Sequence, residues 1–290
     1  MTTADPDASA LRNACAKRID KRTRGHFNDC PWLREAFLDV PREHFVPAQV
    51  WIEEEDRVAV LNRAEQPREW LQAVYRSKQL LVTQIADGRV HPGDEVTEAD
   101  IFTSSISCPA VVVDMLHYLA PQPGGQVLEI GTGTGYSTAL LCHRAGASNV
   151  VSIEIDEGLA QTARDKLHQL DLHPLVVAGD GEEGYADRGP YDRIISTAAV
   201  REVPQAWLHQ AHEGTVIITP IDTPFGCDGL LRLVCDGRGS AQGRLHDGLL
   251  FMKLRGQRER RRYADLGWPE WNQIEVSVSP EGLRTRFDTS

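Results

Sequence analysis

The sequence predicts an α/β fold in which a doubly wound, Rossmann-like sheet carries a helical N-terminal cap and a β-rich C-terminal extension. From Val111 onward, short apolar runs alternate with stretches of helical periodicity, a pattern typical of a parallel sheet covered by helices. A glycine-rich segment at 131–135 follows the first of these runs, where open α/β sheets bind ligands. With 290 residues, 41% of them hydrophobic, the chain can bury such a core and still carry appendages.

The N-terminal part, residues 1–100, is expected to be a helical cap with insertions. Apolar residues recur at helical spacing from Leu11 to Phe37, and Pro41 and Pro47 end that pattern. A short strand is expected at 79–84, inside a charged and turn-rich stretch.

The core, residues 101–225, is expected to alternate strands and helices. Each expected strand is short and apolar, as buried parallel strands are. The expected strands are 126–130, 150–153, 175–177, 193–195 and 215–219, and the expected helices are 111–119, 137–144, 156–169 and 204–211. After these, residues 226–290 are expected to be β-rich, with strands at 230–235, 249–254 and 274–278. They form either an antiparallel edge of the sheet or a small subdomain.

Composition excludes several partners. Lys and Arg number 31 against 42 Asp and Glu, and the net charge of −11 opposes binding to nucleic acid or anionic membranes. No apolar run approaches the roughly 18 residues of a membrane span, and the first residues lack the order of a signal peptide. The six cysteines show no zinc or redox spacing, and the histidines form no ligand set. We therefore expect reduced thiols, no metal and a cytoplasmic location, whereas the oligomeric state stays open.

The strongest chemical signal is the segment 129–136, Glu-Ile-Gly-Thr-Gly-Thr-Gly-Tyr. A dinucleotide fingerprint needs Gly or Ala where this chain has Tyr136, whose bulk opposes the close approach of a pyrophosphate. Glu129 suits a cationic amino-acid group, as in S-adenosylmethionine, better than it suits phosphates. The glycines that let the backbone approach a ligand are Gly131, Gly133 and Gly135. The segment thus predicts S-adenosylmethionine rather than NAD.

Two further acids follow successive strands of the predicted sheet. Glu154 ends the second strand, where a carboxylate can accept hydrogen bonds from both ribose hydroxyls. Asp180 follows the third strand and can accept the amino hydrogens of an adenine. Either acid alone is more often a solvated loop residue or a helix cap, but signals at three consecutive strand ends together indicate a cofactor site.

The order and combination of these motifs resembles the protein-L-isoaspartate O-methyltransferases, class I S-adenosylmethionine-dependent enzymes. The segments that carry the resemblance are 40–47, 105–109, 127–135, 151–156 and 179–194, within the ranges 30–47 and 103–220. The resemblance implies esterification of an aspartyl or isoaspartyl carboxylate in a protein or peptide. A carboxyl group with a pKa near ~4 is already an anion at neutral pH, so such a transfer needs positioning and no catalytic base.

By this resemblance Ser105 and Ser107 line the cleft between cofactor and substrate carboxylate, and their hydroxyls orient the carboxylate. Their alternative role is that of ordinary turn or cap serines before a helix. Glu154 would hold the ribose, and Asp180 with Gly181 would flank the adenine. The other residues expected at the cofactor are Thr132, Tyr136 and Ile155.

Departures from the family keep other functions open. Residues 110–113 stand where the family has a histidine at the start of a helix, and Ser104 and Cys108 replace the family's usual glutamine, alanine or glycine. The insertions at 50–100 and the long C-terminal tail also make this chain longer than the compact repair enzyme. The tail and insertions resemble relatives that methylate an aspartate of a dedicated, ribosomally made precursor peptide. An RNA or small-molecule methyltransferase is disfavoured by the acidic charge. A noncatalytic binding module is disfavoured by the intact glycines and acids.

The run 255–262 is the one basic cluster of this acidic sequence. Such a run is usually a solvated face. Its functional interpretation is a surface that holds an anionic peptide through its carboxylates. The aromatic residues beyond it, Tyr263, Trp268 and Trp271, are expected to pack a core or to form a peptide-binding surface.

Overall fold

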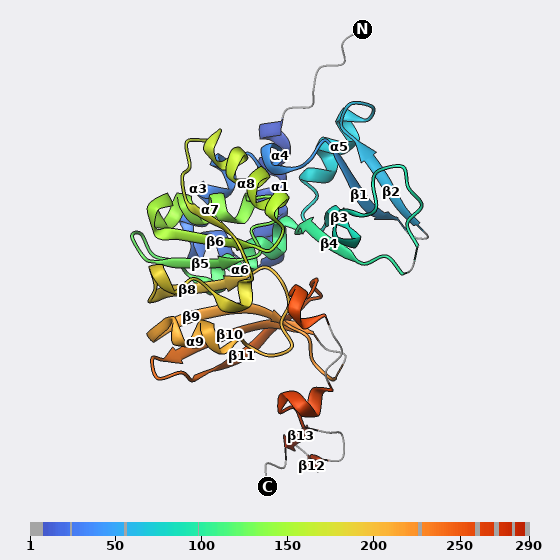
Figure 1. The fold of residues 1–290 in the computed structure, drawn as a ribbon. Helices are drawn as coiled ribbons and strands as arrows, with labels where there is room; N and C mark the ends of the chain where they lie inside the picture. Colours follow the sequence, from blue (N-terminus) through green and yellow to red (C-terminus); the bar gives the residue numbers. More distant parts are fainter. Residues whose placement is uncertain are drawn as a thin grey trace.

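A seven-stranded sheet forms the centre of the protein (Figure 1). The computed structural model describes residues 8–23, 25–54, 57–97, 99–225, 228–258, 262–269, 273–279 and 282–287. The strand order is β11-β10-β9-β8-β5-β6-β7, parallel from β9 to β7 and antiparallel at β10 and β11. The strands are β5 (Val127–Ile130), β6 (Val150–Glu154), β7 (Leu175–Ala178), β8 (Tyr191–Ser196), β9 (Ala211–Ile221), β10 (Gly229–Asp236) and β11 (Ala241–Gly248).

Apolar side chains alternate between the two faces of this sheet. In β5, Val127 packs into the core under one set of helices, whereas Leu128 and Ile130 pack into the core on the opposite face. Helices that contribute to the first core are α1 (Ala8–Thr23), α3 (Pro31–Asp39), α6 (Pro109–Leu119), α7 (Tyr136–Ala145) and α8 (Glu157–His168). The second core contains α9 (Gln205–His209), through Trp207. Both faces of the parallel strands are therefore covered, as their apolar sequences require.

A smaller antiparallel sheet lies beside the central one (Figure 1). Its order is β2-β1-β3-β4, and α5 (Pro67–Val74) accompanies it. The strands are β1 (Gln49–Glu54), β2 (Arg57–Asn62), β3 (Leu81–Ile85) and β4 (Phe102–Ile106). Residues 48–100 thus contain three strands of this sheet and a helix where the sequence indicated a single short strand. The helices α2 (His26–Asp29) and α4 (Arg42–Phe45) complete the N-terminal part.

The C-terminal segment divides between two structures. Strands β10 and β11 form an antiparallel edge of the central sheet, which is one of the two arrangements expected for this part. The prediction of a strand at 249–254 is wrong, because those residues form a loop whose one bridge pairs Lys253 with Ala199. Strands β12 (Ile274–Ser279) and β13 (Gly282–Phe287) pair as a separate hairpin. Trp268 packs against the second core, whereas Trp271, Arg260 and Arg261 lie outside the described residues.

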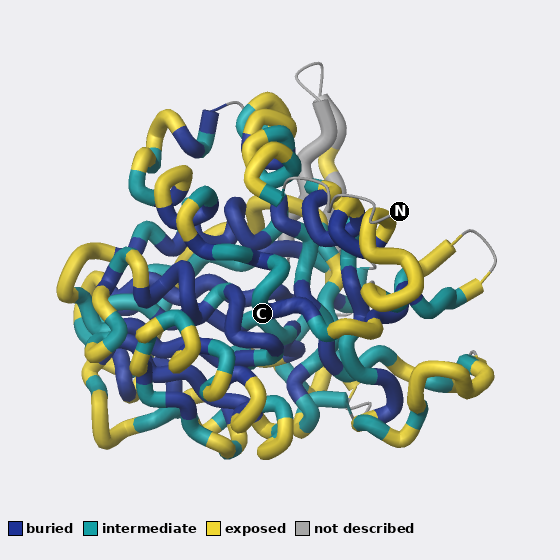
Figure 2. The backbone as a smooth tube through the Cα atoms, turned by 90° about the horizontal axis from the view of Figure 1, so that it is seen from above, coloured by how far each residue is buried: buried dark blue, intermediate teal, exposed yellow. Residues whose placement is uncertain are grey.

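Burial is concentrated in the middle of the molecule, and exposed residues lie on the outer turns and helix surfaces (Figure 2). The described part of the chain contains no helix that combines the length and apolarity of a membrane span.

Candidate active site

A cleft lies where β5, β6, β7 and β8 end, and it encloses about 1110 Å³, part of it open to solvent. One wall comes from the ends of these strands and the other from the smaller sheet, α6 and the segment after β11. The strand-end residues in the lining are Ile130, Gly131, Thr132, Gly133, Thr134, Tyr136, Ser137, Ile153, Glu154, Ile155, Asp180, Gly181, Ile195, Thr197 and Ala198. The opposite wall includes Gln84, Ser105, Ser107, Met115, Lys253, Arg255 and Arg258.

The glycine segment bends tightly because its backbone is left-handed and closely packed. Gly131 has φ 89°, and a Cβ there would lie 2.5 Å from Thr197 Oγ1. The Thr197 hydroxyl instead donates to the Gly131 carbonyl at 2.5 Å. Only glycine fits this position without moving Thr197. Thr197 was not predicted, although it follows the next strand and the same strand-end argument applies to it.

Thr132 lines the cleft but is only 3% exposed, and its hydroxyl lies 2.6 Å from that of Ser152 on β6. Gly133 is at the cleft surface with φ 53°, and its N–H donates to Glu154 Oε2 at 2.8 Å. The loop is therefore tied to the second strand at two successive residues.

Glu129 and Gly135, two of the residues expected at the cofactor, are not among the residues that line the cleft. Strand alternation turns Glu129 toward α7, where its fully buried carboxylate accepts hydrogen bonds from Thr138 Oγ1 at 2.5 Å and Ser152 Oγ at 2.7 Å. Burial raises the pKa of Glu129 above its ordinary value. A Cβ on Gly135 would meet Ala163 at 3.3 Å and Phe45 at 3.5 Å. Glu129 and Gly135 thus both pack on the side of the loop that faces away from the cleft.

Glu154 and Ile155 stand together at the end of β6. The Glu154 side chain accepts the N–H of Gly133 on Oε2 and that of Asp156 on Oε1, at 3.2 Å. It is 7% exposed, and burial raises the pKa of its carboxyl group. Each carboxylate oxygen keeps a second lone pair for a hydroxyl donor. Ile155 is 39% exposed and lines the cleft, which gives this end an apolar surface suited to a flat ring.

Asp180 and Gly181 form the adjoining corner after β7. Asp180 Oδ1 accepts the N–H of Glu182 at 2.9 Å, so Oδ2 is left for another donor. The Gly181 carbonyl accepts Trp207 Nε1 at 2.8 Å, and a Cβ on Gly181 would lie 2.3 Å from Ile130 Cγ2. Trp207 thereby fixes the floor of this corner from the second core.

The two serines lie on the opposite wall. Ser105 belongs to β4 rather than to a turn. Ser107 is the first residue after β4, and Cys108 separates it from α6. Both are half-buried and line the cleft. The Ser105 carbonyl is 3.7 Å from the position of a Cβ on Gly133, so β4 lies directly against the glycine loop. This contact brings the predicted serines and the predicted cofactor loop into one site.

Arg42 supports this wall, a role that the sequence did not reveal although its motif carried the resemblance. Its side chain is completely buried, and it donates to the Ser107 carbonyl at 2.7 Å and to the Val74 carbonyl at 3.0 Å. Its guanidinium also lies 4.9 Å from the ring centre of Tyr136, the residue that ends the glycine loop. One buried cation thus connects the N-terminal helices to both walls.

The family model for protein-L-isoaspartate(D-aspartate) O-methyltransferase matches residues 91–259, more than half of the chain. The chain belongs to the protein-L-isoaspartate O-methyltransferase family. The matched range includes the serine wall, the strand ends and the arginines of the cleft.

Individual relatives match the central part of the chain. A protein-L-isoaspartate O-methyltransferase of Pectobacterium atrosepticum is 48% identical over 118 residues, which are 40% of this chain and 56% of that enzyme. The enzyme of Yersinia pestis strain Pestoides F is 44% identical over 122 residues, 42% of this chain and 58% of that enzyme. The chain therefore spans little more than half the length of these relatives.

Two solved structures share the fold. A protein-L-isoaspartate O-methyltransferase superposes with a TM-score of 0.63 at 24% identity, covering 83% of this chain and 65% of that one. A protein from Plasmodium falciparum, described as a protein-L-isoaspartate O-methyltransferase in complex with S-adenosyl-L-homocysteine, gives a TM-score of 0.56 at 16% identity. It covers 86% of this chain and 99% of that one.

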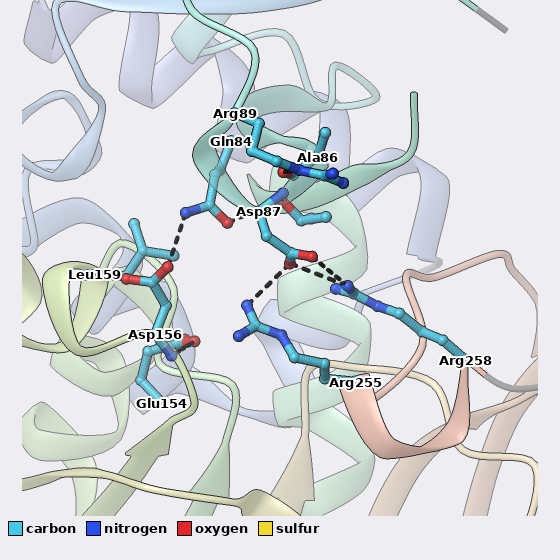
Figure 3. A network of polar contacts seen from close by, with 10 residues as sticks. Gln84, Ala86, Asp87, Arg89, Glu154, Asp156, Leu159, Arg255 and Arg258 are labelled. Carbon is cyan, nitrogen blue, oxygen red and sulfur yellow. Dashed lines mark hydrogen bonds and ion pairs between the residues drawn. The ribbon is translucent and has the colours of Figure 1, made fainter. Parts of the chain in front are cut away.

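In this member of the protein-L-isoaspartate O-methyltransferase family, charged residues from distant segments meet at the mouth of the cleft (Figure 3). Asp87, from the turn after β3, accepts hydrogen bonds from Arg255 and Arg258. Gln84 donates to Asp156 Oδ2 at 3.0 Å and so joins β3 to the start of α8. In the part of the chain that the structure describes, no group of three or more His, Cys, Asp or Glu side chains is arranged to hold a metal ion.

Proposed function

We propose that this chain is an S-adenosylmethionine-dependent O-methyltransferase that esterifies an isoaspartyl or aspartyl carboxylate of a protein or peptide. The observation that carries the proposal is the apposition of β4 and the glycine loop, with the Ser105 carbonyl 3.7 Å from a Cβ position on Gly133. A methyl donor held by the loop and a carboxylate held by the serines would share one cleft. Membership of the family supports the same reaction.

The cleft residues fit S-adenosylmethionine. Gly131 and Gly133 expose backbone where a side chain would fill the cleft. Glu154 offers carboxylate lone pairs for the ribose hydroxyls, and Ile155 gives an apolar face for the adenine. Asp180, next to Gly181 in the cleft lining, has Oδ2 to offer as an acceptor for the adenine amino group. We therefore assign cofactor binding to these residues, with Thr132 and Tyr136 shaping the loop.

The chain's own contribution to the reaction is positioning. When bound, S-adenosylmethionine supplies a methyl group on a positively charged sulfur. An aspartyl-type carboxylate is already ionised at neutral pH, so no residue has to remove a proton. We assign Ser105 and Ser107 to orient the carboxylate by donating hydrogen bonds to it. Arg42, through its bond to the Ser107 carbonyl, holds that donor in place.

The proposal is tested with two peptides that share one sequence and differ in a single isoaspartyl or aspartyl residue. Incubation with methyl-labelled S-adenosylmethionine should label the isoaspartyl peptide, because an exposed main-chain carboxylate enters the cleft without unfolding the chain around it. Labelling of the aspartyl peptide alone would indicate a dedicated peptide-tailoring substrate. No label in either peptide, despite binding of S-adenosylhomocysteine, would refute the carboxyl-transfer assignment.

We also propose a cytoplasmic location. The described cysteines are all free thiols, namely Cys15, Cys30, Cys108, Cys142 and Cys235, whereas Cys227 lies outside the described residues. Free thiols are typical of a reducing compartment. Fractionation of cells that produce the protein should recover it with cytosolic markers, and its recovery in a secreted fraction would contradict this.

A further inference from the structure

We propose that Arg255 and Arg258 form a second carboxylate-binding subsite in the cleft wall, which Asp87 fills until an acidic side chain of the peptide replaces it. The proposal rests on the proposed function, because it specifies the substrate as a peptide that carries an acidic residue near its methylated carboxylate. It adds a specificity determinant outside the serine and cofactor positions.

The geometry of the subsite is that of carboxylate recognition. Arg255 Nη2 lies 2.9 Å from Asp87 Oδ1, and Arg258 Nη1 lies 3.0 Å from both Asp87 oxygens. Figure 3 shows both guanidinium groups directed at this one carboxylate. Two guanidinium groups therefore share the Asp87 carboxylate, and the nearby Asp156 carboxyl also feels the charge of Arg255.

The subsite belongs to the reaction cleft and is accessible. Arg255 and Arg258 line the same cleft as Ser105 and Ser107. Their side chains are 35% and 24% exposed, and that of Asp87 is 34% exposed, so a ligand can reach the ion pairs. Lys253, the neighbouring cation of the lining, is paired with Asp222 at 2.9 Å. The acids Glu154 and Asp180 on the opposite wall would repel an anionic peptide, and the two arginines offset that repulsion.

The arginines stand on a fixed segment. The turn η5 (Arg255–Gln257) is held by the Gln257 side chain, which donates to Glu182 Oε2 at 3.1 Å and accepts the N–H of Arg201 at 2.6 Å. Just before it, the Leu254 N–H donates to the Ala199 carbonyl at 2.9 Å. A binding group supported in this way needs little reorganisation when a ligand arrives.

Asp87, in contrast, is presented by a strained turn. Ala86 and Asp87 have φ values of 50° and 54°, in the left-handed region that non-glycine residues avoid. The Asp87 N–H donates to Thr103 Oγ1 at 3.0 Å, which holds the turn in this conformation. A carboxylate on a flexible peptide can make the same contacts without strained backbone, so exchange with Asp87 is feasible.

The test measures binding of labelled isoaspartyl peptides by fluorescence anisotropy with S-adenosylhomocysteine present. The peptides carry either Glu or Gln at successive positions beside the isoaspartyl residue. At one position the wild-type protein should bind the Glu peptide about tenfold more tightly than the Gln peptide, the size expected for hydrogen bonds between charged groups. Arg255→Gln and Arg258→Gln should each reduce this ratio. Arg262→Gln, which alters an arginine 82% exposed and outside the cleft lining, should preserve it.

The Asp87→Asn substitution distinguishes this proposal from a purely structural ion pair, because the two predict opposite changes in affinity for the Glu peptide. Removal of the internal competitor should tighten binding of the Glu peptide by roughly threefold, the scale of a half-exposed ion pair. Weaker binding of both peptides to the Asp87→Asn protein would mean that the ion pair is a structural clamp and would overturn the proposal. Equal wild-type affinity for Glu and Gln peptides at every position would overturn it too. Methyl transfer to the Gln peptide would in that case still support the proposed function.

Discussion

The two walls of the cleft are built in different ways. The strand-end wall is buried and held by backbone geometry: Thr132 is 3% exposed and Glu154 7%. Part of the opposite wall is held by the ion pairs of Asp87 with Arg255 and Arg258, whose side chains are 24% to 35% exposed. The difference fits the proposed function, in which the rigid wall holds the cofactor and the polar, accessible wall contacts the peptide.

The largest effect is expected from a side chain placed in the rigid wall. Gly131→Ala combines a left-handed φ of 89° with a Cβ 2.5 Å from Thr197 Oγ1. We expect it to lower the free energy of unfolding by about 2 to 5 kcal/mol and to prevent cofactor binding. Urea unfolding and calorimetric titration with S-adenosylhomocysteine measure both effects.

Gly124→Ala is the matched control, because Gly124 has φ 76° with no atom near its Cβ position. It should cost only the backbone part, about 1 to 2 kcal/mol. Equal losses in the two variants would mean that the glycine loop is not closely packed against Thr197.

A smaller effect is expected from Glu154→Gln, which removes the negative charge at the end of β6. Affinity for S-adenosylhomocysteine should fall about 10- to 100-fold, as expected for hydrogen bonds to a charged acceptor. Glu157→Gln, in the exposed first turn of α8, should leave this affinity unchanged. Unchanged affinity in the Glu154→Gln protein would remove Glu154 from the cofactor site.

On the opposite wall, Ser107→Ala should separate chemistry from cofactor binding. We expect turnover to fall about 10- to 100-fold, because the hydroxyl orients the carboxylate as the transition state forms. Affinity for S-adenosylhomocysteine should stay within about twofold, since the serine lies across the cleft from the cofactor residues. Ser148→Ala on the exposed surface is the control. A parallel fall in affinity would mean that Ser107 belongs to the cofactor wall.

The smallest expected effect concerns α6, which continues the serine wall. His117 of α6 stacks on His26 with ring centres 3.7 Å apart, and burial, with His26, lowers the pKa of His117. The folded protein therefore binds this proton less readily than the unfolded chain. The contribution of His117 to the free energy of unfolding is complete above the unfolded-state pKa of about 6.5. It is lost as the pH falls from there through the lower pKa of the folded state.

Unfolding of the His117→Gln protein should accordingly depend less on pH between about 7 and 5. The exposed His173 provides the control, and His173→Gln should follow the wild-type profile. An unchanged pH profile in the His117→Gln protein would show that the stacked pair does not limit stability in acid.

The rigid wall could be predicted from the sequence largely because it depends on local patterns. The strand and helix alternation placed Gly131, Glu154 and Asp180 at consecutive strand ends, and the structure gathers them in one cleft. The direction of the Glu129 side chain could not be predicted, because an apolar run does not show which face of a buried strand a side chain takes.

The accessible wall could not be predicted in the same way. Asp87 and Arg255 are 168 residues apart, and no periodicity relates them. The basic run was noticed as a candidate for anionic peptides, but its position in the cleft depends on the loop after β11, where the sequence indicated a strand. Long-range polar contacts of this kind follow from the assembled fold.

Whether the methyl acceptor is a carboxylate, as proposed, is tested most directly by the stability of the product. The labelled isoaspartyl peptide should release its methyl group as volatile methanol in mild alkali, because the neighbouring backbone nitrogen displaces methanol from the ester. The peptide mass should first gain one methyl group and then fall to that of the succinimide. A label that survives alkali, with a stable mass gain, would place the methyl group on nitrogen or on a hydroxyl and contradict the account.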